Sequence, residues 1–334
     1  MLFDMTANNN ARKFMILDPE FPQDVTVTAI RGQTASVTFE ARILEHGKPA
    51  EYTYQWYVNG TPIEGATSAI YTRDVSESSN SEKVYCAVSN KKGTLNTRVA
   101  NLTVLYAPIL NESHPSNATV VSGKSVTCNV TIKEDGNPAE YTYQWYKDDI
   151  AIDGANASSY TVETDFIGTT SLHCVVTNAA GYVTSRKATI TTTPYYIYKD
   201  GSFADGGSYG FIGDDEDDYG KLESGVLHLY DESSGWASIY TTNKYDFTKR
   251  KTLYFRCPQL NHTGSKSTFY FGVADTQKDS AYIASYAVAA YASSTEKTFS
   301  LDVSKVTGKH YIKFGTVRNE YASSHIYVNQ IYFG

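Results

Sequence analysis

The chain has 334 residues, which is long enough for two or three domains of ordinary size. Its formal net charge of −7 argues against nucleic-acid binding, and its apolar residues never form the run of roughly 18 to 20 that spans a bilayer. Tyrosine is abundant, with 28 residues against 3 Trp, and this predicts β structure with binding surfaces because tyrosine suits half-buried sheets and interfaces.

The N-terminal segment, residues 1–20, is expected to be an arm outside any domain. Its longest apolar run, Phe14–Leu17, is shorter than the core of about 7 to 15 residues in an export signal, so we expect no signal-directed export. Apolar residues nevertheless occur in it, and we expect them to dock on a neighbouring protein: Phe3, Phe14, Met15, Ile16 and Leu17. The alternatives are a flexible leader or an extra edge strand on the first domain.

An internal repeat follows the arm. Pro49–Tyr57 recurs without change as Pro138–Tyr146, which places Trp56 and Trp145 89 residues apart, close to the roughly 100 residues of a β-sandwich domain. Alternating strand patterns precede each copy, and an Asn-x-x-Gly turn follows a cysteine downstream of each. The repeat predicts two sandwiches, residues 21–106 and 107–193.

These motifs resemble the immunoglobulin-like family, particularly the tandem modules of phage and bacterial surface proteins. The resemblance implies that Trp56 and Trp145 lie in the two cores. Cys128 and Cys174 stand at the family's two cysteine positions, whereas Phe39 replaces the first cysteine opposite Cys86. The family's tyrosine corner is missing from both repeats, because Val84 and Leu172 occupy its position.

The four cysteines indicate the compartment in which the chain folds. Cys128 and Cys174 would form a disulfide in an oxidising medium, but Cys86 and Cys257 have no partner cysteine. A secreted disulfide scaffold rarely leaves two of four cysteines single, so we expect reduced thiols and cytosolic folding. No cysteine or histidine spacing indicates a metal site or a catalytic nucleophile.

Residues 194–334 are expected to form a third, jelly-roll-like β-sandwich, which makes the whole chain all-β. They hold 17 of the 28 tyrosines, and alternating segments predict strands at 226–230, 236–240, 253–256, 268–272, 298–303, 310–314, 325–328 and 331–333. The pattern from Gly220 to Gly334 is similar to galactose-binding-like sandwiches of phage tail and capsid-surface proteins, and this resemblance implies carbohydrate binding.

Two kinds of candidate site lie in this third domain. Aromatic residues in loop-like contexts are candidates for stacking on sugars: Trp236, Tyr209, Tyr219 and Tyr321. The acidic, glycine-containing stretch Asp200–Asp218 is a candidate Ca²⁺ loop, with ligands drawn from Asp214, Asp215, Asp217 and Asp218, or else a plain solvated loop.

Extracellular-type modules without an export signal predict a non-enzymatic phage virion surface protein, because virions assemble in the cytosol and are released by lysis. We expect a capsid decoration, head-fibre or tail accessory protein, present in many copies, which meets other virion proteins through the arm and host-surface polysaccharide through the third domain. The alternatives are a bacterial surface adhesin, which needs an anchor, and a glycan hydrolase, which needs paired carboxylates flanking a cleft.

Overall fold

The computed structural model describes residues 15–47, 50–213, 218–231, 235–262, 267–277, 281–289, 292–318 and 323–334. Within these residues the regular elements are β-strands apart from one 3₁₀ turn, η1 (Glu77–Ser79), as the composition predicted. The chain divides into two compact units, one of residues 1–115, 129–159 and 173–187, the other of residues 116–128, 160–172 and 188–334. In the described part, no helix has the length and apolar character needed to cross a membrane.

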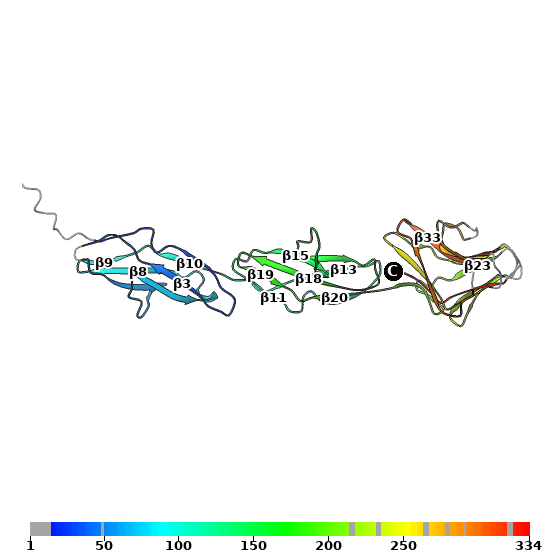
Figure 1. Cartoon of the computed structure of the whole chain (residues 1–334), viewed down its shortest axis with the longest axis horizontal. Coiled ribbons are helices and arrows are strands. Elements are labelled where there is room, and N and C mark those ends of the chain that lie inside the picture. Colours follow the sequence, from blue (N-terminus) through cyan, green and yellow to red (C-terminus); the bar gives the residue numbers. More distant parts are fainter. Residues whose placement is uncertain are drawn as a thin grey trace, which may run out of the picture. The chain divides into compact units, whose positions relative to one another are not determined.

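The first sandwich is immunoglobulin-like (Figure 1). Its larger sheet has the order β2 (Val25–Thr28), β10 (Ala100–Leu105), β8 (Lys83–Asn90), β5 (Thr53–Val58) and β6 (Thr61–Pro62), with β9 (Gly93–Asn96) also on β8. Strand β2 runs parallel to β10, and β8 and β5 are antiparallel neighbours. The remaining pairs are β3 (Ala35–Glu40) with β7 (Ile70–Val75), and β1 (Ile16–Leu17) with β4 (Ile43–Glu45). The turn predicted at Asn90–Gly93 joins β8 to β9.

The core of this sandwich forms around Trp56. Its side chain is fully buried, and its indole Nε1–H donates to the Ser68 carbonyl oxygen at 2.8 Å. Phe39 lies 6.3 Å from the indole between ring centroids, and Cys86 is buried in the same core. Met15, only 2% exposed, also belongs to it. The end of the predicted arm is therefore an extra strand of this sandwich, which was the alternative interpretation for these residues.

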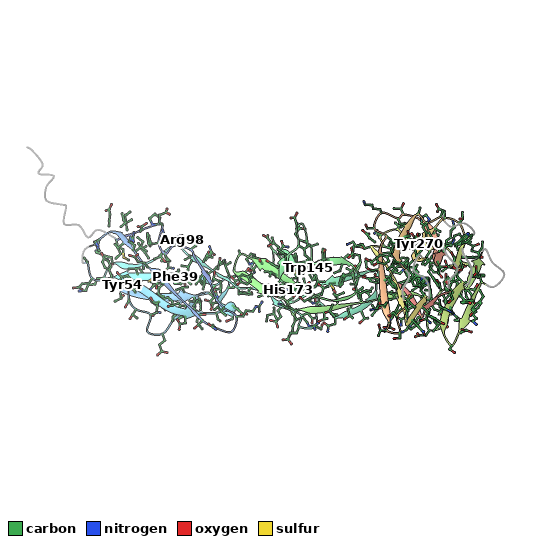
Figure 2. All side chains as sticks on the ribbon, turned by 45° about the vertical axis from the view of Figure 1, so that its right-hand side comes forward. Phe39, Tyr54, Arg98, Trp145, His173 and Tyr270 are labelled. Atoms are coloured by element: carbon green, nitrogen blue, oxygen red, sulfur yellow. The ribbon has the colours of Figure 1, made fainter. Side chains whose placement is uncertain are left out.

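The second sandwich repeats the same strand order (green in Figure 1). Its larger sheet contains β12 (Ala118–Val121), β20 (Ala188–Thr193), β18 (Gly168–Asn178), β15 (Thr142–Lys147) and β16 (Ile150–Ala151), with β19 (Gly181–Thr184) on β18. The smaller pairs are β13 (Ser125–Asn129) with β17 (Ser159–Glu163), and β11 (Ile109–Leu110) with β14 (Ile132–Glu134). Trp145, labelled in Figure 2, is fully buried, and its Nε1–H donates to the Ala157 carbonyl oxygen at 2.9 Å. Cys128 and Cys174 are buried thiols and form no disulfide.

The C-terminal sandwich follows, with β23 and β33 marked in Figure 1. One sheet has the order β23 (Tyr209–Gly213), β26 (Gly235–Thr241), β33 (Lys309–Arg318), β30 (Ser267–Ala274) and β31 (Ala284–Ala289), with β27 (Tyr245–Asp246) on β33. A second has β22 (Ser202–Phe203), β21 (Tyr195–Lys199), β35 (Gln330–Phe333), β28 (Thr252–Cys257) and β32 (Lys297–Asp302). The third has β24 (Tyr219–Glu223), β25 (Val226–Asp231), β34 (Ser324–Val328) and β29 (Gln259–His262).

The second and third of these sheets are continuous with each other. Only Pro258 separates β28 from β29, and only Asn329 separates β34 from β35. One hydrophobic core contains side chains from all three sheets, including Leu229, Phe255 and Phe314. All eight strands predicted for this region are present, at bounds shifted by a few residues. Most core positions hold Leu, Ile, Val or Phe, and most of the described tyrosines of this domain are only partly buried.

Candidate ligand-binding face of the C-terminal sandwich

The outer face of the β24-β25-β34-β29 sheet carries an unusual set of side chains. Along β25, Leu227 and Leu229 point into the core, so His228 and Tyr230 point to the opposite side. Along β34, Ile326 is in the core, and its neighbours His325 and Tyr327 face outward in the same way. Two neighbouring strands therefore present the same outward pair, a histidine and a tyrosine two residues apart.

Strand register extends these pairs into two rows across all four strands. One row is Tyr219, Tyr230, His325 and Asn261. The other row is Lys221, His228, Tyr327 and Gln259. Seven of these eight side chains are partly exposed, and only His228 is buried, at 4%. We call these eight residues the aromatic–histidine face.

The rings of this face pack on one another. His228 stacks on Tyr327 with centroids 4.1 Å apart and planes 12° apart. In the other row, Tyr230 lies 4.9 Å from Tyr219 and 4.6 Å from His325, with tilted planes. Neighbouring rings thus cover much of each ring's surface and make the face rigid. Each aromatic pair stabilises the folded state by about 0.5–1.5 kcal/mol. Hydroxyl, imidazole and amide groups together with ring edges remain to meet a ligand.

A chain of hydrogen bonds fixes the two histidines. Glu223 can only accept, so His228 Nδ1–H donates to Glu223 Oε2 at 3.1 Å. Nε2 of the neutral His228 ring then accepts a hydrogen bond from Nδ1–H of His325 at 2.9 Å. Burial lowers the pKa of His228, and the hydrogen bond to Glu223 opposes this effect only in part. Burial therefore favours the neutral form of His228, and the hydrogen-bond chain sets the orientation of both imidazole rings.

The charges on the face are paired. Lys221 Nζ lies 2.5 Å from Glu223 Oε1 and 4.3 Å from the centroid of the Tyr219 ring. The carboxylate of Glu223 raises the pKa of Lys221, and the ammonium group in turn lowers the pKa of Glu223. The charge of Lys221 is therefore offset by that of Glu223, and the other members of the face offer uncharged hydrogen-bonding groups.

The aromatic residues predicted from sequence are found in different places. Tyr219 is part of the aromatic–histidine face. Trp236 lies on β26 in another sheet, where its half-buried ring has the Lys313 ammonium 5.5 Å from the ring centroid. Tyr209 begins β23 and packs against the core. Tyr321 lies outside the described residues. The expected loop contexts were wrong for Tyr209, Tyr219 and Trp236, which are all strand residues, so no cluster of loop aromatics forms from them.

Four aspartates were the candidate calcium ligands. Asp214, Asp215 and Asp217 lie outside the described residues, whereas Asp218 is placed and is 7% exposed. Among the side chains that are described, no group of three or more His, Cys, Asp or Glu residues is arranged to hold a metal ion. The calcium loop therefore stays a prediction.

Sequence reasoning missed His228, Tyr230, His325 and Tyr327. The signal was present, because His228-Leu-Tyr230 and His325-Ile-Tyr327 both place histidine and tyrosine on one side of a strand around a core residue. What the sequence alone does not show is that the two strands are neighbours.

Comparison with known proteins shows a partial similarity to a curated phage protein. No protein-family model matches the chain. This chain is 29% identical over 175 residues to a highly immunogenic outer capsid protein of Enterobacteria phage T4. The alignment covers 47% of this chain and 43% of that protein. The chain therefore aligns with less than half of the relative's length.

Among solved structures, an I-band fragment of titin is 13% identical with a TM-score of 0.42, covering 93% of this chain and 89% of that chain. Extracellular domains 3–5 of Drosophila OTK are 15% identical with a TM-score of 0.38, covering 55% of this chain and 63% of that chain. Similarity at this level carries no inference about function.

Proposed function

We propose that this chain is a non-enzymatic surface protein of a phage virion whose C-terminal sandwich binds a host-surface glycan. The virion assignment is supported by the similarity to the outer capsid protein of phage T4. Capsid decoration is the favoured role, since the relative is a capsid protein. Tandem immunoglobulin-like sandwiches suit such a role as spacers, and their fold alone implies no catalysis.

The single observation that carries glycan binding is the aromatic–histidine face. A glycan presents many hydroxyl groups, which both donate and accept hydrogen bonds, and it carries apolar patches between them. The face matches this with tyrosine, imidazole and amide groups arranged in two rows, held rigid by ring packing and the Glu223–His228–His325 chain. Rigid groups lose little entropy on binding, so more of each contact is realised as affinity.

Affinity at one such site is expected to be low, near a millimolar dissociation constant or about −4 kcal/mol. Useful attachment would then depend on many copies on one particle binding together. Attachment of the chain itself to the particle is proposed for the N-terminal segment before Met15, because Met15 and Leu17 already pack in the first sandwich.

The test uses the full chain on a glycan array and on host cell walls, presented in multivalent form. We expect binding that is lost when Tyr230→Ala and Tyr327→Ala are combined. The matched control is Tyr254→Ala. It removes a tyrosine from a cross-strand stack with Tyr332 in the β22-β21-β35-β28-β32 sheet, where the two ring centroids are 4.9 Å apart. Loss of binding in the control as well, or no binding by the multivalent wild type, would count against the face.

The virion assignment has its own test. Mass spectrometry and imaging of purified particles should detect the chain on the particle surface, and deletion of residues 1–14 should release it while leaving it folded. A bacterial adhesin would instead be found on cells that carry no phage particles. Finding the chain only on such cells would refute the virion proposal and would leave the glycan-binding proposal unaffected.

A further inference from the structure

A pocket of about 470 Å³ lies in the C-terminal sandwich, away from the eight residues of the aromatic–histidine face. It is formed where β32 ends, β33 begins and the chain enters β31. Ile283 and Val306 give it an apolar wall, while Asp302, Lys305, Thr307 and His310 supply polar groups. This volume lies within the range of about 300–1,000 Å³ that is usual for small-ligand sites.

The loop that forms one wall is anchored at both ends. At its start, Val303 is fully buried and its N–H donates to the Lys251 carbonyl oxygen at 2.8 Å. At its end, Gly308 adopts a φ of +87°, which favours glycine, and its carbonyl oxygen accepts from Phe247 N–H at 2.8 Å. Between them, Val306 N–H closes a turn onto the Val303 carbonyl oxygen at 2.9 Å. The pocket wall is therefore preformed.

His310 is a fixed part of this wall. Its Nδ1 lies 2.8 Å from Asp275 Oδ1, and its Nε2 lies 2.7 Å from the Thr307 carbonyl oxygen. Both ring nitrogens therefore have a hydrogen-bonding partner within the protein, and these two contacts fix the plane of the ring. Phe247 packs against the ring edge to face, with centroids 5.9 Å apart. Because both nitrogens are engaged, His310 shapes the pocket and leaves ligand contacts to its neighbours.

The remaining polar groups are one acid, one base and one hydroxyl. Ser304 N–H donates to Asp302 Oδ1 at 2.9 Å, which orients the carboxylate. Lys305 adds hydrogen-bond donors, and the Thr307 hydroxyl both donates and accepts. The opposite charges of Asp302 and Lys305 offset each other, so an ion of either sign gains little. An uncharged ligand with adjacent hydroxyl groups can satisfy the acid and the base together.

We propose that this pocket binds one uncharged sugar residue, with its apolar side on Ile283 and Val306 and its hydroxyls on Asp302, Lys305 and Thr307. Ile283 is 47% exposed, which leaves apolar surface for such a contact. The proposal rests on the proposed function, because the ligand class is that of the glycan bound by the same sandwich. The pocket would be a second site in the same sandwich. It would bind one sugar residue of the glycan, whereas the aromatic–histidine face would contact a longer stretch of it.

The experiment mixes the full chain with the methyl glycosides of glucose, galactose, mannose and N-acetylglucosamine, with glucuronate as the charged comparison, and records saturation-transfer NMR. We expect at least one neutral sugar to bind, more tightly than glucuronate. Lys305→Met and Asp302→Asn should each weaken that binding about tenfold, since each removes hydrogen bonds to a charged group. The matched control is Lys297→Met, which removes an exposed lysine from the start of β32, the strand that ends at Asp302.

Unchanged melting of each variant shows that the fold is intact. The combined Tyr230→Ala and Tyr327→Ala variant separates the two proposals, because it should lose polymer binding and keep the single sugar. The pocket proposal is overturned if no neutral sugar binds, if glucuronate binds as well as the neutral sugars, or if the Lys305 and Asp302 variants match Lys297→Met. Polymer binding that survives those results would leave the proposed function standing.

Discussion

Replacing Trp56 with alanine removes the largest side chain of the first core. A tryptophan buries about 200 Å² of surface, which at about 25 cal/mol per Å² corresponds to about 5 kcal/mol. Tryptophan-to-alanine substitutions in cores cost about 3–5 kcal/mol after partial relaxation. The lost indole hydrogen bond to the Ser68 carbonyl oxygen accounts for about 1 kcal/mol of that range. We expect a loss of about 4 kcal/mol for Trp56→Ala.

For a sandwich of this size, 1 kcal/mol shifts the melting temperature by about 4–8 °C, so the expected fall is about 15–30 °C. Differential scanning calorimetry of the full chain should show one transition moving down while others stay in place. Trp236→Ala serves as the comparison, because that indole is half-buried and should change stability far less. A Trp56→Ala protein that melts within a few degrees of the wild type would refute the idea that this indole organises the core.

Three further predictions concern single positions. His173→Tyr should make the second sandwich less sensitive to acid. Desolvation lowers the pKa of buried His173 below 6.5, so the contribution of this side chain to the free energy of unfolding is full above about pH 6.5 and is lost as the pH falls. Urea titrations between about pH 7.5 and 5 would measure the difference. Burial raises the pKa of Cys257 well above its usual value, so iodoacetamide should label it only after unfolding, and fast labelling of the native protein would contradict its burial. Gly272→Ala should cost about 1–3 kcal/mol in thermal melts, because its new Cβ would clash with the Ala284 carbonyl oxygen, and a neutral result would contradict that close packing.

The histidine prediction has a control within the chain itself. Tyr57 stacks on Tyr85 in the first sandwich with centroids 4.9 Å apart. Tyr146 stacks on His173, labelled in Figure 2, at the same distance in the second. Asp149 Oδ1 lies 3.6 Å from His173 Nδ1, too far for a hydrogen bond, and Lys187 already occupies that carboxylate. Equal acid sensitivity in both sandwiches would contradict the role given to His173.

The two immunoglobulin-like sandwiches were readable from sequence because their signals are local. An unchanged segment around Trp56 and Trp145, alternation in the neighbouring strands and the Asn-x-x-Gly turns each follow from residues close together in the chain. The eight predicted strands of the C-terminal sandwich were found for the same reason. Short strands without strong alternation, such as β21–β24, were missed.

The site depended on long-range pairing, which periodicity does not reveal. His228 and His325 are 97 positions apart and meet only because β25 pairs with β34. Tyr219 follows an acidic run, and Trp236 follows a Ser-Ser-Gly segment. The turn-like composition of both segments suggested loops. Ladder hydrogen bonds and packing override that local preference, and both residues become part of strands.

Each sandwich contains one of the chain's three tryptophans, and their surroundings differ. Trp56 and Trp145 are sealed in apolar cores, whereas Trp236 is half-exposed beside the ammonium group of Lys313. Excited indoles emit at wavelengths that depend on the polarity around them, and water-soluble quenchers reach only exposed rings. The unaltered chain therefore carries an optical reporter in every sandwich. Three variants, each with two of the three tryptophans replaced by phenylalanine, would keep one indole each. The emission of that indole would report the unfolding of its own sandwich, or the binding of a ligand near it, without an added dye.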